Sequence, residues 1–215
     1  PEISRFMHDW TCSIGTTIEV ERLLAAYDRL RQPLQDERPA LRYPVVLGKT
    51  LDAIGTEFGM PVDAGLREQF CGIAAIHQPF DDSVQALADL RAMGLKLAAL
   101  SNVDEASFAA VMKRAGIVFD VVVTAERVGA YKPDHAHFWA ALADLRALGI
   151  SMQRVLHVAQ SRRADIVAAN QLGLTCVWVN RPGHVFGRVG RGAEDAVPDF
   201  EADSLATVVR MLHCD

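Results

Sequence analysis

The sequence predicts an α/β fold, in which a Rossmann-like parallel sheet follows a small helical domain. From about residue 79, short runs of β-branched and apolar residues alternate with stretches rich in alanine and leucine, a pattern typical of βαβ units. Most of these helical stretches end at a glycine, the preferred residue just after a helix. Residues 18 to 76 show helical periodicity without strand signals.

Each element of the α/β part can be placed from its local sequence. We expect strands at residues 95–100, 118–124, 155–159 and 175–180. We expect helices at residues 83–93, 104–115, 134–147, 163–172 and 203–213. Right-handed crossovers place the carboxyl ends of such strands on one edge of the sheet, where the ligands of open α/β sheets bind.

The part before residue 79 reads as two or three amphipathic helices, at about residues 19–32, 44–58 and 62–76, with prolines between them. A helical layer of this kind is consistent with a cap that closes over the strand ends. We therefore divide the chain into an atypical N-terminal segment (1–18), a helical cap (19–78) and an α/β core (79–215). The glycine-rich residues 183–198 are expected to form a long surface loop.

The composition argues against several classes of partner. The net charge is −5 and no basic run is present, which disfavours nucleic acids and anionic membrane surfaces. No apolar stretch is long enough for a membrane span, and the first residues do not resemble a secretory signal. The four cysteines are widely spaced without a CxxC pair, so we expect neither a zinc site nor a disulfide framework. A cytoplasmic protein with a small-molecule ligand fits best.

Polar side chains follow three of the expected strands, where packing does not require them. Ser101 and Asn102 follow the first strand, Lys132 lies in a loop after the second, and Gln160 and Ser161 lead from the third to Asp165. A hydroxyl and an amide can donate to an anion, an ammonium can neutralise a carboxylate nucleophile, and a further carboxylate can hold that ammonium in place. The set predicts a site at the carboxyl edge of the sheet.

Three segments carry a family resemblance: ALSNVDEASF, GAYKPDHAHF and VLHVAQSRRADIVAANQLGLTCVWVNRPG. They resemble the second, third and fourth motifs of the haloacid dehalogenase superfamily, and most closely those of its 2-haloacid dehalogenase-like branch. The resemblance implies that Ser101 and Asn102 contact the carboxylate or phosphate end of the substrate. It also implies that Lys132 steadies a nucleophilic aspartate and that Asp165 anchors Lys132.

Further residues are candidates for the site, although a purely structural role is possible for some of them. Gln160 and Ser161 are candidate substrate-binding residues, as are Arg38 and Arg42 of the cap, which could bind a carboxylate. Either Ser101 or Asp104 could cap the helix at 104–115. We expect His157 to be a core histidine with its hydrogen bonds satisfied. His135 and His137 have no third ligand at metal-binding spacing.

Two departures from the family pattern bear on the chemistry. Phosphatases of this superfamily have an acidic residue at the position of Gln160, and a neutral amide is a poor Mg²⁺ ligand; we therefore expect no metal and no cofactor. The family's first motif, an apolar strand ending in a nucleophilic aspartate, has no counterpart here. Aligning Asp9 and Trp10 with the acid–tryptophan pair that trails this motif in some relatives would leave Glu2 as the nucleophile.

The missing motif also leaves the central strand of the sheet unaccounted for. Unpaired buried backbone groups cost about 1 to 3 kcal/mol each, so we expect the position to be filled. Residues 1–8 could form a short strand, a partner could donate one, the two flanking strands could pair directly, or an upstream segment could supply it. A homodimer, with or without strand donation, is expected from the resemblance.

The sequence thus leads to a metal-independent haloacid dehalogenase-like hydrolase acting on a small carboxylate-type substrate with a carbon–halogen or related bond. One alternative is a non-hydrolytic family member that acts as a binding or partner-dependent protein. Another is a truncated form of an active enzyme.

Overall fold

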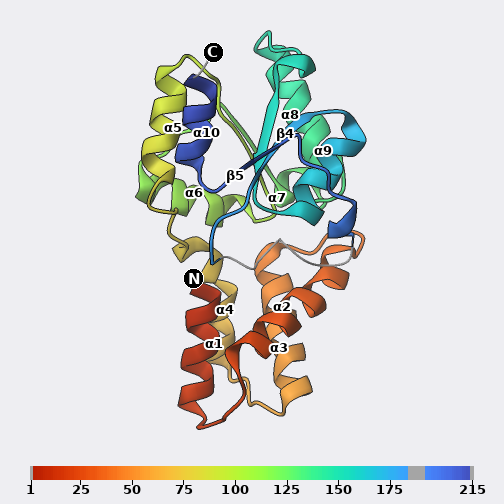
Figure 1. The fold of residues 1–215 in the computed structure, drawn as a ribbon. Helices are drawn as coiled ribbons and strands as arrows, with labels where there is room; N and C mark the ends of the chain where they lie inside the picture. Colours follow the sequence, from red (N-terminus) through yellow and green to blue (C-terminus); the bar gives the residue numbers. More distant parts are fainter. Residues whose placement is uncertain (1, 184–191, 214–215) are drawn as a thin grey trace. The chain divides into compact units, whose positions relative to one another are not determined.

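The computed structural model describes residues 2–183 and 192–213. Contacts divide the chain into two compact units (Figure 1). The helical unit comprises the described residues within 1–78, 102–114 and 124–131. The sheet unit comprises those within 79–101, 115–123 and 132–215.

The helical unit contains α1 (Glu2–Ser13), α2 (Val20–Gln35), α3 (Tyr43–Phe58), α4 (Ala64–Cys71) and a 3₁₀ turn at Ile73–Ile76. Short α7 (Ala125–Val128) and nearly all of α6 (Glu105–Ala115) also belong to it. Buried aromatic side chains form its core: Trp10 and Phe70 lie at 2% and 0% exposure, and the rings of Phe6 and Phe70 are 4.7 Å apart. The expected cap helices are present, with the last of them broken after Cys71.

The first residues form a helix rather than a strand. Met7, Trp10 and Thr11 are the buried positions of α1, the i, i+3, i+4 spacing of a single helix face. The Trp10 indole donates to the Pro61 carbonyl at 3.2 Å. The expectation that residues 1–8 could form an abbreviated strand is therefore wrong, and Glu2 begins a helix instead of ending a strand.

The sheet unit contains the α/β elements in the expected order. Its strands are β1 (Ala98–Ser101), β2 (Val121–Thr124), β3 (Leu156–Ala159), β4 (Thr175–Val179) and β5 (Phe200–Ala202). Its helices are α5 (Ser83–Ala92), α8 (Ala136–Ala147), α9 (Val167–Leu172) and α10 (Leu205–His213). A π-helical turn, Arg162–Ile166, precedes α9, and 3₁₀ turns lie at Met152–Arg154 and Ala193–Asp195. The α/β fold predicted from the sequence is confirmed; β5 is an addition to it.

The strands form two separate sheets. One is β1–β2, and the other is β3–β4–β5 with all strands parallel. In the register of the second sheet, Val158 lies opposite Val177, which in turn lies opposite Phe200. In the described part of the chain β1 and β3 are not hydrogen-bonded neighbours. Direct pairing of these two strands, one of the ways in which we expected the central position to be filled, is therefore wrong.

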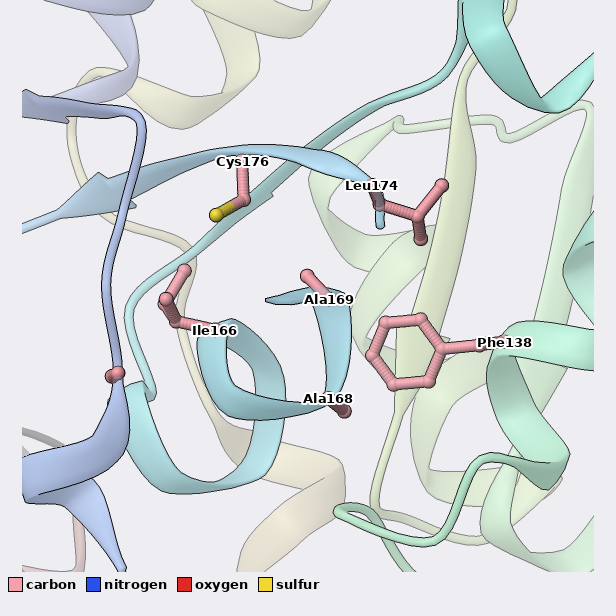
Figure 2. Packing of buried hydrophobic residues seen from close by; sticks show 7 residues of the cluster. Phe138, Ile166, Ala168, Ala169, Leu174 and Cys176 are labelled. Atoms are coloured by element: carbon pink, nitrogen blue, oxygen red, sulfur yellow. The ribbon is translucent and has the colours of Figure 1, made fainter. Parts of the chain in front are cut away.

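Helices cover both faces of the strands. On one face, α8, the π-helical turn and α9 contribute Phe138, Ile166 and Ala169, respectively, to a buried cluster that also contains Leu174 and Cys176 (Figure 2). Leu100 of β1 and Ala159 of β3 both pack against this cluster. On the other face α5 and α10 lie side by side (Figure 1).

Part of the expected surface loop at 183–198 lies outside the described residues, namely 184–191. Within the ranges that the structure describes, no helix combines the length and the hydropathy that crossing a membrane requires.

Candidate functional site

The site is built around a buried ion pair in the sheet unit. Lys132 is only 7% exposed, and its ammonium donates to the Leu100 carbonyl at 2.7 Å and to Asp165 Oδ1 at 2.7 Å. Leu100 belongs to β1, and Asp165 lies in the π-helical turn after β3. The ammonium therefore links the carboxyl ends of two strands that do not pair with each other.

The turn after β3 fixes the position of Asp165. The Ser161 hydroxyl accepts from the Ala164 amide at 3.1 Å, and the Ser161 carbonyl accepts from the Asp165 amide at 3.1 Å. Burial of Asp165 opposes its ionisation, but the charge of Lys132 and the contact with His157 hold the pKa of Asp165 well below its ordinary value. Asp165 is therefore a carboxylate at neutral pH, and Ser161 has a structural role in this turn.

His157 of β3 also lies beside Asp165. Its Nε2 lies 3.3 Å from Asp165 Oδ1, the oxygen that Lys132 contacts. This separation is compatible with an ion pair, but the orientation does not give an aligned hydrogen bond, and Nε2 has no hydrogen-bond partner in the described residues. We expected a core histidine with satisfied hydrogen bonds; His157 is instead a neighbour of the site.

His137 of α8 holds the end of β1. Its Nε2 lies 3.2 Å from the Ser101 carbonyl, and because a carbonyl only accepts, Nε2 carries the proton. Burial and the nearby charge of Lys132 lower the pKa of His137 to about 4. His137 is thus neutral at pH 7 and fixes the backbone at the residue predicted to contact substrate.

The other predicted residues lie apart from this ion pair or serve the local structure. Asp104, not Ser101, caps α6, because it accepts from the Ser107 amide at 2.9 Å. The Gln160 carbonyl accepts from the Trp178 indole at 2.9 Å. Asn102 follows β1 and belongs to the helical unit.

The two cap arginines have partners within the helical unit. Arg38 donates to the carbonyls of Gln35 and Glu37 at 3.3 and 3.0 Å. Arg42 Nε lies 3.1 Å from a carboxylate oxygen of Glu126. Their predicted binding of a substrate carboxylate stays a prediction.

Sequence reasoning missed His137 and His157 as members of the site. Each is a polar side chain in an otherwise apolar stretch, and a buried imidazole requires a polar partner. This requirement indicates that both histidines have polar neighbours. It does not identify those neighbours, because the contacts with Ser101 and Asp165 are made only in the tertiary fold.

Within the described residues, no group of three or more His, Cys, Asp or Glu side chains could hold a metal ion. The acidic position after β3 that would favour Mg²⁺ is Gln160. The neutral amide of Gln160 is a poor ligand for a divalent metal.

Comparison with known proteins identifies a matching family model and several relatives. A family model described as haloacid dehalogenase-like hydrolase matches residues 17–173. The (S)-2-haloacid dehalogenase of Pseudomonas sp. (strain YL) is 35% identical over 155 residues, which are 71% of this chain and 63% of that protein. The glyceraldehyde 3-phosphate phosphatase of Methanopyrus kandleri is 34% identical over 143 residues, which are 64% of this chain and 59% of that protein. The chain thus spans less than two thirds of either relative.

Solved structures agree in fold over nearly the whole chain. The crystal structure of an L-2-haloacid dehalogenase superposes with a TM-score of 0.76 at 25% identity, covering 100% of this chain and 94% of the other. The L-2-haloacid dehalogenase from Xanthobacter autotrophicus gives a TM-score of 0.76 at 19% identity, covering 99% and 93%.

Proposed function

Because the chain belongs to the haloacid dehalogenase-like hydrolase family, we propose that it acts as a metal-independent hydrolase of the 2-haloacid dehalogenase type. The substrate is a small carboxylate with a carbon–halogen bond at the neighbouring carbon. The observation that carries the proposal is the buried Lys132 ammonium, held at 2.7 Å by both Leu100 and Asp165 at the strand ends. Such an ammonium keeps a neighbouring carboxylate ionised and therefore nucleophilic.

The proposed reaction has two steps. A carboxylate oxygen attacks the halogen-bearing carbon, so that a C–O bond forms as the carbon–halogen bond breaks and halide leaves with the electron pair. Water then adds to the carbonyl of the resulting ester, the acyl–oxygen bond breaks, and the nucleophilic carboxylate is regenerated with release of a 2-hydroxy acid and a proton. No redox partner is needed.

The chain's own residues have supporting roles in this proposal. Ser101 and Asn102 donate to the substrate carboxylate, aided by Gln160, Ser161 and the cap arginines Arg38 and Arg42. Asp165 holds Lys132 through the contact at 2.7 Å, the role that the resemblance implies for it, and the nucleophile is a different carboxylate.

Phosphate ester hydrolysis is the second candidate, because the phosphatase of Methanopyrus kandleri is also a relative. Gln160 argues against it, since a neutral amide replaces the carboxylate that would bind Mg²⁺. A third candidate is binding without hydrolysis, which fits the same ion pair.

The proposal predicts halide release that does not depend on a divalent metal. We expect chloride release from chloroacetate and (S)-2-chloropropionate, measured with an ion-selective electrode, to be unchanged by EDTA. Glyceraldehyde 3-phosphate with Mg²⁺ is the comparison substrate. Phosphate release without halide release would contradict the proposal, as would a folded protein that turns over neither substrate.

Two further proposals concern the cellular compartment and the oligomeric state of the protein. A reducing cytoplasm is supported by Cys12, Cys71 and Cys176, which are free thiols. The homodimer expected from the resemblance is tested by sedimentation velocity across a range of concentrations.

A further inference from the structure

We propose that His157 is a positioning residue of the site: its Nε2 carries a proton directed at Asp165 Oδ1, and this second donor fixes the carboxylate that holds Lys132. All three side chains belong to the sheet unit. The positioning itself does not depend on any reaction, whereas its effect on turnover rests on the proposed function.

The first observation is the face of β3 on which His157 lies. Successive residues of a strand point to opposite faces of its sheet. Leu156 and Val158 pack in the cluster that includes Val208 of α10, so His157 points to the opposite face. There its ring lies 5.0 Å from that of Phe138 in α8, a side chain without an oxygen or nitrogen atom that could accept a hydrogen bond. A polar partner for the imidazole must come from another element.

The second observation is that a π-helical turn brings a carboxylate to this imidazole. The turn Arg162–Ile166 is wider than an α-helix, because the Ile166 amide donates to the Ser161 carbonyl, five residues back, at 3.2 Å. The turn packs against β3 and leaves Asp165 Oδ1 at 3.3 Å from His157 Nε2. Single π-helical turns of this kind occur frequently at functional sites.

The third observation concerns the proton of the imidazole. A neutral imidazole has one protonated and one bare nitrogen, and an ionised carboxylate only accepts. A bare Nε2 would direct its lone pair at a carboxylate oxygen 3.3 Å away, whereas a protonated Nε2 directs an N–H dipole at it. The side chains of His157 and Asp165 are only 11% and 9% exposed, so water screens this difference little. The tautomer with the proton on Nε2 is therefore favoured.

The fourth observation is that two donors from different elements approach one oxygen. Lys132 precedes α8 and reaches Asp165 Oδ1 at 2.7 Å, and a carboxylate oxygen can accept from two donors. The longer and less aligned contact of His157 makes it the weaker donor, which orients the carboxylate without supplying its counter-charge. The ammonium of Lys132 stands on a flexible stem, whereas His157 is anchored in a strand. His157 thus limits the movement of Asp165 and, through it, that of Lys132.

Two replacements separate this role from simple packing against Phe138. Phenylalanine keeps an aromatic ring at position 157 but has no donor, whereas glutamine loses the ring and keeps an N–H donor at the end of its side chain. If His157 positions the carboxylate, His157→Gln should resemble the unaltered chain and His157→Phe should not. If His157 only fills space, the order of the two variants is reversed.

The first measurement is NMR of the 215-residue chain and needs no turnover. We expect the Hε2 proton of His157 to resonate downfield and to exchange slowly with water, because its acceptor is charged; the resonance should move upfield in Asp165→Asn. We expect the Lys132 ammonium to give a proton–nitrogen cross-peak in the unaltered chain and in His157→Gln, and none in His157→Phe. His213→Phe, at the exposed end of α10, is the matched control and should change neither signal.

The second measurement is halide release by the same variants. We expect His157→Phe to lower kcat about tenfold with little change in KM, because a displaced ammonium affects the reacting groups more than it affects substrate binding. His157→Gln should retain most of kcat. If Asp165→Asn does not fold, the comparison of the glutamine and phenylalanine variants still decides between positioning and packing.

Several outcomes would overturn the inference. One is a proton on Nδ1 instead of Nε2 of His157 in the unaltered chain at neutral pH. Another is a Lys132 cross-peak that is kept in His157→Phe, or lost equally in both variants. In a chain that releases halide, a kcat unchanged by His157→Phe would also contradict it. A chain that shows the expected NMR signals yet releases no halide would contradict only the proposed function.

Discussion

Replacing Lys132 by alanine is expected to reduce halide release by about 10²- to 10³-fold, the usual effect of removing one charge-stabilising donor from an active site. The same change should lower the free energy of unfolding by about 3 to 5 kcal/mol, because it leaves the buried carboxylate of Asp165 without its counter-ion. Urea denaturation at pH 7 measures the second effect. Lys113→Ala, at an exposed lysine of α6, is the matched control and should change neither quantity.

The double variant Lys132→Met with Asp165→Asn separates the two effects. With both charges removed, no buried carboxylate is left unpaired, and most of the lost stability should return. Halide release should not return, because no ammonium is left to keep the nucleophile ionised. Recovery of activity in the double variant, or full stability of Lys132→Ala, would contradict the role given to this ion pair.

The stability of the protein is expected to fall between about pH 6.5 and pH 4 because of His137. Its pKa is lowered from 6.5 to about 4 in the folded protein. In this window the unfolded chain binds a proton at His137 and the folded protein does not, so stability decreases as the pH falls. A shift of this size corresponds to a loss of about 3 kcal/mol. Below pH 4 both states are protonated and this contribution levels off.

His137→Gln is expected to flatten the dependence in that window, because glutamine can still donate to the Ser101 carbonyl but does not titrate. Urea denaturation at several pH values measures it, with His213→Gln, at the exposed end of α10, as the control. Asp165 acts in a separate window: its pKa is depressed, so its contribution is present above about pH 4 and is lost only as the pH falls towards its folded pKa. An unchanged slope between pH 6.5 and 4 in His137→Gln would contradict this assignment.

The α/β elements could be predicted from the sequence because their local signals agree with their final environment. The helix expected at 83–93 is α5 (Ser83–Ala92), and the strand expected at 175–180 is β4 (Thr175–Val179). Periodicity and terminal glycines mark such elements without tertiary information. The strand β5 (Phe200–Ala202) was missed because its sequence carries acidic residues and little apolar signal; pairing with β4 makes it a strand.

The helix α1 carries a helical signal in its own sequence. Its buried residues Met7 and Trp10 stand three apart, a spacing that favours one face of a helix. The resemblance favours a strand before the helical unit, and the local periodicity is the better guide here.

Part of the site was accessible from the sequence and part was not. Order along the chain placed Ser101, Lys132 and Asp165 at strand ends, and the structure brings Lys132 and Asp165 to 2.7 Å. Their catalytic roles stay predictions. His157 could not be assigned to the site from sequence, because its contact with Asp165 depends on how the turn after β3 folds back.

The covalent intermediate tests the central claim most directly. The protein is mixed with (S)-2-chloropropionate, quenched in acid within the first turnover and analysed by peptide mass spectrometry. The account predicts a propionate ester on a carboxylate other than Asp165, formed in the presence of EDTA and absent from the Lys132→Met variant. An ester on Asp165, or halide release without any ester, would contradict it.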